Sequence, residues 1–405
     1  MDANLLSIAP NFVPESGQFF FTAKDLNSFQ RAQYMDTFGF YQNLFGLYTY
    51  MPMNRRNKFT VHTPKGQPLM WQPYTSCSYS PTGSITIGTR ELEPDPMYMK
   101  EMFCHDIFLE SAYEHMIEYA TSGNVDLTPE GTMIFNQLID ELLANAAYGF
   151  RITAATGQLY NVDSVSYSPE NTANITDLFK RTHGTIKGWL KLAKDLAAAE
   201  YPWMDLPVVA PSDFDATGSF TGNILDLLDE LKANARGPLR QLINRGGIVQ
   251  QGRFSFYPLV LVSTSYFNAI VDRYNFESTQ VATNRTRITM REFGGETSPT
   301  PQRVYYLDGM LPILPVDDVN GFDPYLAGDT HFCGIVASGN IQIGASFTSL
   351  PQDVENNDMG VLIARDNDPV SNSFGQYAVL SHALAKTAIA DPNYFVGAIT
   401  HTTPA

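Results

Sequence analysis

Residues 58–92 restrict the fold of this chain more than any other stretch. Apolar side chains alternate with polar ones in two series, whose apolar members are Phe59, Val61, Leu69, Trp71, Ile85 and Ile87. Alternation of aromatic and β-branched residues predicts β-strands. Residues 73–83, between the two series, are mostly Ser, Thr, Tyr, Pro and Gly, which favour turns. We therefore expect a long two-stranded ribbon over 58–92.

Such a ribbon needs other protein packed against it. A two-stranded ribbon is marginally stable in water by itself. Prolines exclude it from the middle of a wide sheet, and this stretch contains Pro64, Pro68, Pro73 and Pro81. Its apolar face must be covered either by its own domain or by a neighbouring copy of the chain. In the second case, the six apolar residues are contacts between subunits.

Length and composition narrow the class of protein. The chain has 405 residues, enough for two or three domains with their own cores. Its longest apolar runs, such as 259–262, are far too short to span a membrane, and the acidic amino terminus does not resemble a signal peptide. Three widely spaced cysteines predict neither a disulfide framework nor a Cys-based metal site. These features favour a protein folded in a reducing cytoplasm.

Charge is negative overall and unevenly distributed. The net charge of −16 argues against a broad groove for nucleic acid, because such a groove needs Lys and Arg to neutralise phosphates. Residues 308–368 hold ten acidic side chains and one basic one, whereas residues 232–253 hold five basic side chains and no acid. Two interpretations are open: these are solvated faces, or surfaces of opposite sign meet between copies of the chain.

Four segments in the first 235 residues have the apolar spacing of helices. The clearest begins at Thr128-Pro129-Glu130, where Thr suits the cap, Pro the first turn and Glu the helix dipole. Its apolar stripe stops near Gly149, which predicts a helix over 128–148, about 30 Å long. The other expected helices are 97–119, 174–200 and 223–235. The helix over 174–200 is basic, which fits a solvated surface or a site for an acidic or membrane partner.

The C-terminal half is dominated by strand and turn patterns. Residues 256–262 predict a buried strand, followed by a helix to about Tyr274 that Ser263 or Ser265 caps. Turns are expected at Asp308-Gly309 and Gly339-Asn340. Further expected strands are 303–307, 311–316, 331–337, 341–347, 360–364 and 394–400. Residues 376–389 fit a helix or a strand, and strand is favoured in the latter half. The predicted fold class is therefore α+β.

Motifs for catalysis or metal binding are missing from the sequence. No Gly-Lys pair occurs, so there is no phosphate loop, and HExxH and GxSxG are absent. Residues 316–327 are acidic, but Val316 and Ala327 stand where a calcium loop needs carboxylates. We predict no catalytic residues, no metal and no cofactor. A hydrolase whose carboxylates come from distant parts of the chain remains an alternative of another class.

The order of these elements resembles that of tailed-bacteriophage major capsid proteins. An arm, a long ribbon, a short helix and a capped helix ending near TGQL precede the strand–cap–helix YPLVLVSTSYFNAIVDRY. The later stretches YLDGMLPILPVDD, AGDTHFCGIVASGNIQIGA and SHALAKTAIADPNYFVGAIT are similar to successive strands of that family. These local patterns, in a fixed order over most of residues 40–401, imply the Hong Kong phage 97 capsid fold.

The resemblance implies a division of the chain into parts. These are an N-terminal arm (1–57), the extended ribbon loop (58–92), a peripheral domain (93–218), an axial domain (219–372) and closing peripheral strands (373–405). The peripheral domain would contain the spine helix 128–148 and a helical insertion near 174–200. In this family the ribbon lies across the adjacent subunit, which is the cover that a ribbon needs.

The function implied by the resemblance is structural. The chain would self-assemble as pentamers and hexamers into an icosahedral shell, in the host cytoplasm, and end in the virion. It would enclose DNA without sequence-specific binding and would not interact with a membrane. Its possible partners are portal, scaffolding and decoration proteins. Lys65 is the ribbon lysine that could join a cross-link of the kind some relatives form, but it precedes the expected tip. An encapsulin-like cellular nanocompartment, which shares the fold, is the alternative.

Overall fold

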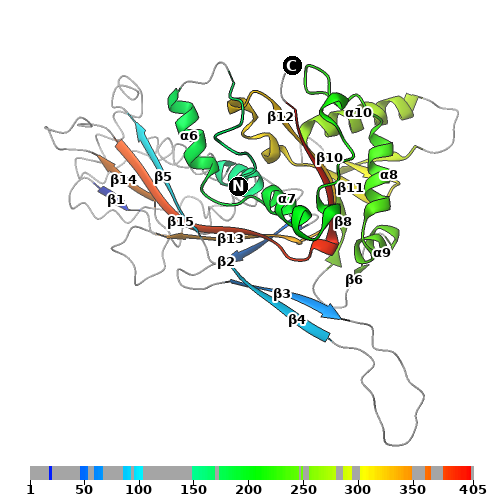
Figure 1. The fold of residues 1–405 in the computed structure, drawn as a ribbon, viewed down its shortest axis with the longest axis horizontal. Coiled ribbons are helices and arrows are strands. Elements are labelled where there is room, and N and C mark those ends of the chain that lie inside the picture. The colour runs from blue at the N-terminus through cyan, green and yellow to red at the C-terminus, as the bar shows by residue number, and fades with distance from the viewer. Residues whose placement is uncertain are drawn as a thin grey trace, which may run out of the picture.

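The structure is a computed structural model, and it confirms the α+β class (Figure 1). It describes residues 18–20, 46–52, 59–66, 85–92, 95–103, 148–168, 173–245, 248–249, 255–279, 286–293, 302–348, 361–365 and 377–402. Residues 148–156 are helical. The α-helices that follow are α6 (Ala173–His183), α7 (Trp189–Ala199), α8 (Ile224–Asn234), α9 (Gly237–Arg245) and α10 (Thr264–Thr279).

The first large sheet is built around the long strand β15. Its order is β1-β14-β15-β13-β2, and β5 also pairs with β15. β15 pairs antiparallel with β5, β13 and β14, and β2 runs parallel to β13. The strands are β1 (Gln18–Phe20), β2 (Tyr48–Pro52), β5 (Asp95–Phe103), β13 (Ile341–Thr348), β14 (Val361–Arg365) and β15 (Tyr377–Ile389).

The second large sheet contains five of the strands expected in the C-terminal half, together with β9, which was not expected; the segments 341–347, 360–364 and 376–389 belong to the first sheet. Its order is β16-β12-β8-β11-β10-β9, with only β8 and β11 parallel. The strands are β8 (Pro258–Val262), β9 (Ile288–Phe293), β10 (Gln302–Leu307), β11 (Leu311–Pro315), β12 (Asp329–Ala337) and β16 (Phe395–Thr402). A short pair, β6 (Ile248–Val249) and β7 (Ser255–Phe256), lies before β8.

Local sequence signals explain the turns of this sheet. Asp308 and Gly309 have φ values of 52° and 71°, the left-handed pair that a tight hairpin between β10 and β11 requires. Ser263 precedes α10, and its carbonyl accepts the Phe267 N–H at 3.0 Å. The Ser263 hydroxyl accepts the Phe332 N–H of β12 at 3.1 Å instead of capping the helix. The serine therefore joins the helix start to the sheet.

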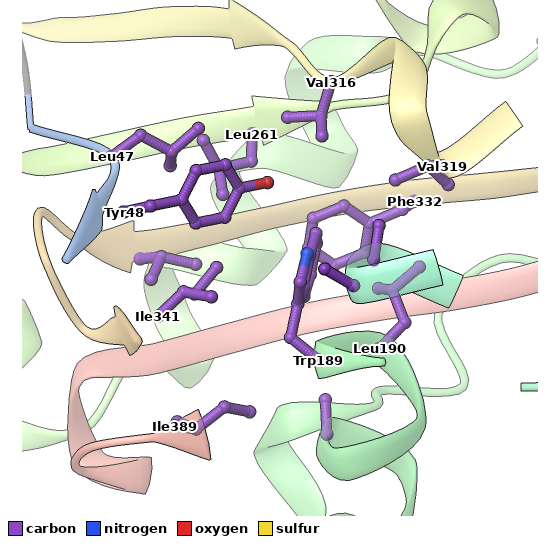
Figure 2. Close-up of a cluster of buried hydrophobic side chains, with 14 of the residues drawn as sticks. Leu47, Tyr48, Trp189, Leu190, Leu261, Val316, Val319, Phe332, Ile341 and Ile389 are labelled. Atoms are coloured by element: carbon purple, nitrogen blue, oxygen red, sulfur yellow. The ribbon is translucent and has the colours of Figure 1, made fainter. Parts of the chain in front are cut away.

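One hydrophobic core joins the two sheets. Figure 2 shows Trp189 and Leu190 of α7 beside Phe332 of β12, and Tyr48 and Ile341 come from the first sheet. The ring centroids of Trp189 and Phe332 are 5.0 Å apart in an edge-on arrangement. All five side chains are at least 96% buried. Burial of each large apolar side chain of this kind contributes about 1.5–3 kcal/mol to the stability of the folded state.

The prediction of a helix over 97–119 is wrong for its first residues. Residues Asp95–Phe103 form strand β5, which pairs with β15 over its whole length. Met, Lys and Glu are good helix formers, but helix propensity is a weak determinant, and pairing with a strand far along the chain overrides it. Residues 104–147 lie outside the described part, and with them the rest of this segment and nearly all of the expected spine helix.

The helix expected over 174–200 is two helices. α6 ends at His183 and α7 begins at Trp189. A Cβ on Gly188 would lie 2.5 Å from the Ala155 carbonyl oxygen, so this turn packs directly on the backbone of the helical segment 148–156. That segment runs seven residues beyond the expected stop at Gly149, because Gly157, not Gly149, makes the close turn against residue 186.

Gly237-Pro238 ends α8, as expected, but it also begins α9, which was not expected.

The two sheets also cross the expected domain boundaries. β13 and β14, from the segment 219–372, pair with β15, and β16, from the segment 373–405, pairs with β12. The division into axial and peripheral domains stays a prediction, and the two parts share strands in both sheets.

Candidate functional site

The expected ribbon is present as two antiparallel strands. β3 (Phe59–Gly66) pairs with β4 (Ile85–Leu92) along their whole length, from Phe59 opposite Leu92 to Gly66 opposite Ile85. Two of the six residues predicted as subunit contacts, Leu69 and Trp71, lie outside the described residues. The other four, Phe59, Val61, Ile85 and Ile87, are in the paired strands.

The register of the ribbon corrects the expectation of a single apolar face. Positions 59 and 61 lie opposite 92 and 90, whereas positions 85 and 87 lie opposite 66 and 64. Opposite positions share a face and successive positions alternate between faces. The expected contact positions 59 and 61 of β3 and 85 and 87 of β4 therefore fall on different faces. The alternation within each strand was readable from the sequence, but the register between them was not.

The ribbon forms a sheet of its own. Among the strands that the structure describes, β3 and β4 pair with each other and with no other strand. In Figure 1 they lie below the two large sheets, beyond the end of β2. No element of either large sheet therefore extends the ribbon by hydrogen bonding within the described part of the chain.

Both ends of the ribbon lead into the first sheet. β2 precedes it and pairs with β13, and β5 follows it and pairs with β15. The β2 root is fixed in the core by Leu47 and Tyr48, which are 1% and 4% exposed. The β5 root is tied to β15 by an ion pair between Asp95 and Lys386 at 2.6 Å. The first sheet thus holds both ends of the ribbon.

Polar groups buried inside the body are mostly structural. Arg151 and Asp318 form an ion pair at 3.1 Å, with 7% and 2% of their side chains exposed. This pair joins the helical segment 148–156 to the short 3₁₀ helix η4 (Asp317–Asn320). Burial raises the pKa of Asp318 to about 7, against the opposing effect of Arg151.

A second buried carboxyl lies in the same connection between β11 and β12. Asp323 accepts hydrogen bonds from the Thr330 N–H at 3.1 Å, the Thr330 hydroxyl at 2.8 Å and the Asn320 amide at 2.7 Å. Burial raises its pKa to about 7. The Tyr160 hydroxyl bonds to Thr330, which ties the loop after the helical segment to this connection. Every partner here is a neighbouring part of the fold.

The arrangement closest to a catalytic pair involves Ser265 and His331. The Ser265 hydroxyl lies 2.8 Å from His331 Nδ1, and His331 Nε2 lies 3.0 Å from the Thr402 hydroxyl. Burial lowers the pKa of His331 to about 4, and the ring stacks on Phe214 with centroids 3.6 Å apart. A hydroxyl, not a carboxylate, orients the ring, so no charge stabilises an imidazolium there. This neutral histidine links α10 to β12 and β16.

The described residues contain no group of three or more His, Cys, Asp or Glu side chains placed to hold a metal ion. Nor is any of the helices in the described ranges long and apolar enough to cross a membrane. The buried polar groups found here were not singled out from the sequence. Asp318 and Asp323 stand in Gly- and Pro-rich turns, where Asp is expected for local hydrogen bonding, so the pattern hid their burial.

Comparison with known proteins gives likenesses in structure alone. The sequence matches no protein-family model and no curated protein. The chain is similar to one in the satellite phage P4 procapsid including the size determination (Sid) protein, at 9% identity and a TM-score of 0.43, covering 93% of this chain and 98% of that one. A chain from the capsid of the native GTA particle is similar at 13% identity and a TM-score of 0.42, over 88% of this chain and 88% of that one. A chain of Gordonia phage Cozz gives 12% identity and a TM-score of 0.43, over 87% of this chain and 84% of that one.

Proposed function

We propose that this chain is a tailed-bacteriophage major capsid protein, a structural subunit and not an enzyme. It assembles as pentamers and hexamers into an icosahedral shell around the phage genome, and its working place is the virion. The observation that carries the proposal is the ribbon β3–β4, which pairs with no other described strand and lies between β2 and β5 of the first sheet. The order of sequence patterns that resembles this family supports it.

The physical argument starts from the cost of an uncovered ribbon. A two-stranded sheet is marginal in water, and here the apolar positions are divided between its two faces. Packing against one surface of its own body would cover one face at most. Neighbouring subunits in a shell can lie on both sides, and repeated contacts of this kind close into rings. The ribbon residues Phe59, Val61, Leu69, Trp71, Ile85 and Ile87 are proposed as those contacts.

The charge of the chain fits a container. A net charge of −16 disfavours tight contacts with phosphates, which a shell that only encloses DNA does not need. Portal, scaffolding and decoration proteins are the further partners that such a shell would use. His331, Asp323 and Asp318 are held by hydrogen bonds or an ion pair within the fold, which supports a role without catalysis.

The test is to shorten the ribbon. Because Gly66 lies opposite Ile85, replacing residues 67–84 by Asn-Gly closes the two strands with a tight hairpin turn. We expect the full chain to form shells by negative-stain microscopy and analytical ultracentrifugation, and the shortened chain to stay in small oligomers. Its circular dichroism and its melting temperature should match those of the full chain, because β2 and β5 still anchor the hairpin.

Two results would contradict the proposal. One is a full chain that remains a monomer or small oligomer at high concentration. The other is a shortened chain that assembles as well as the full chain. Nucleic acid inside shells purified from infected cells separates a phage capsid from an encapsulin-like compartment, which would hold protein cargo.

A further inference from the structure

Two helices that follow each other in the sequence, α8 and α9, expose charges of opposite sign. The buried side of α8 consists of Ile224, Leu225, Leu227, Leu228 and Leu231, and its exposed side carries Asp226, Asp229 and Glu230. The buried side of α9 is Leu239, Leu242 and Ile243, and its exposed side carries Arg240 and Arg245, with Arg236 just before it. No acidic residue occurs in the sequence from 231 to 271.

Part of this charge is already neutralised within the subunit. Arg287 donates to both carboxylate oxygens of Asp229 at 2.7 and 2.8 Å and to Asp308 at 2.9 Å, and Lys232 also bonds to Asp308. This network answers one expectation from the sequence. At this point the acidic segment that starts at Asp308 and the basic segment that starts at Lys232 meet within one subunit.

The remaining charges have no ion-pair partner among the described residues. Asp226 and Glu230, one helical turn apart, form the acidic face. Arg240 and Arg245 form the basic face; Arg240 donates one hydrogen bond to the Ala233 carbonyl, which leaves most of its five N–H donors for another group. Arg236 stacks on Trp203 at 3.8 Å and is set aside. Within the described part of the chain, neither face has an ion-pair partner.

We propose that the basic face of α9 (Arg240 and Arg245) binds the acidic face of α8 (Asp226 and Glu230) on the next copy of the chain. Two different faces of the same subunit then meet in a head-to-tail contact, and such contacts generate rings when the rotation closes. Charge complementarity favours a second copy of the chain as the partner, since an identical chain carries the face of opposite charge. The inference rests on the proposed function and names one contact within its pentamers and hexamers.

The test uses charge reversal with a matched control. Arg240→Glu with Arg245→Glu, or Asp226→Lys with Glu230→Lys, replaces attraction by repulsion at every contact in the ring. We expect either pair to raise the subunit concentration needed for assembly by about tenfold or more, measured by analytical ultracentrifugation. The control, Lys180→Glu with Arg181→Glu on α6, changes the net charge as much as the first pair. It should leave assembly close to that of the unaltered chain.

Recombining the variants separates this contact from a loss of folding. A chain with all four substitutions restores opposite charges between copies and should regain both pentamers and hexamers. An equimolar mixture of the two reversed chains restores them only where the chains alternate around the ring. Alternation closes in hexamers and fails in pentamers, so the mixture should give hexamers without closed icosahedral shells.

The outcomes are distinct. Reversed chains that assemble like the control would overturn the contact, and so would a four-substitution chain that keeps its circular dichroism but stays unassembled. Failure of the unaltered chain to assemble would instead overturn the proposed function. Assembly should also weaken between 0.1 and 1 M salt, because the screening length falls from about 10 to about 3 Å.

Discussion

Loss of the buried ion pair between Arg151 and Asp318 should destabilise the subunit strongly. This pair is the ionic link between the helical segment 148–156 and η4, and it lies beside the contact of Ile152 with Gly321. Asp318→Ala removes the carboxylate and leaves a guanidinium that is 7% exposed. Removal of one member of a buried ion pair typically costs about 3–5 kcal/mol in the free energy of unfolding.

The assay is urea unfolding of the unassembled subunit. With an m-value of about 3 kcal/mol/M, the loss lowers the midpoint by about 1–1.7 M. The control is Asp317→Ala, whose side chain is exposed, and which should change the free energy by less than about 0.5 kcal/mol. Replacing both partners, Arg151→Leu with Asp318→Leu, should recover most of the loss, because neither charge then needs solvation.

The pH dependence of the free energy of unfolding gives a second test. Burial raises the pKa of Asp318 to about 7, above its value in the unfolded chain, so the folded state binds this proton more tightly. Its contribution to stability is therefore largest below the unfolded pKa and is lost as the pH rises through 7. The cost of Asp318→Ala should be larger at pH 5 than at pH 8. Equal midpoints for Asp318→Ala and Asp317→Ala, or a cost that shrinks on acidification, would refute the reasoning.

Three further predictions concern the packing of the body. Gly188→Ala should lower the melting temperature clearly, since its Cβ would lie 2.5 Å from the Ala155 carbonyl oxygen, whereas Gly237→Ala, with no atom within 4 Å, should not. Gly309→Ala should cost about 1–2 kcal/mol in urea unfolding, because φ is 71° there. Burial lowers the pKa of His331 to about 4, so its contribution is present above the unfolded pKa of 6.5 and is lost as the pH falls toward 4. His331→Gln should flatten the dependence of stability on pH in that window by up to about 1.4 kcal/mol per pH unit.

The second sheet could be predicted because its signals are local. β10 and β11 alternate or are wholly apolar over five or six residues, and Asp308-Gly309 between them supplies the left-handed turn. Gly339, whose φ is 69°, likewise marks the turn between β12 and β13, although these two strands belong to different sheets. Where strand, turn and strand are adjacent, the pattern contains most of the information that the fold uses.

Prediction failed where a distant partner decides the structure. β5 has a helical composition, yet its partner β15 starts 274 residues later, at Tyr377 opposite Phe103. The break between α6 and α7 was signalled by Gly184 and Gly188. It was missed because Ile186, buried in the loop, continues the helical spacing of apolar residues. In the ribbon, each strand was readable but the pairing was not, because a register depends on the length of the turn.

The parts of the chain that stabilise the subunit differ from the parts proposed to join subunits. Trp189, Leu190 and Phe332 are buried by the two large sheets and α7 of the same chain. The ribbon pairs with no other described strand, and the unpaired charges of α8 and α9 lie on exposed faces. Substitutions in the first set should therefore change the melting temperature of the unassembled subunit, and substitutions in the second set should change only the concentration at which it assembles. A subunit built in this way folds first as a stable unit and completes the environment of its ribbon only when other copies are present.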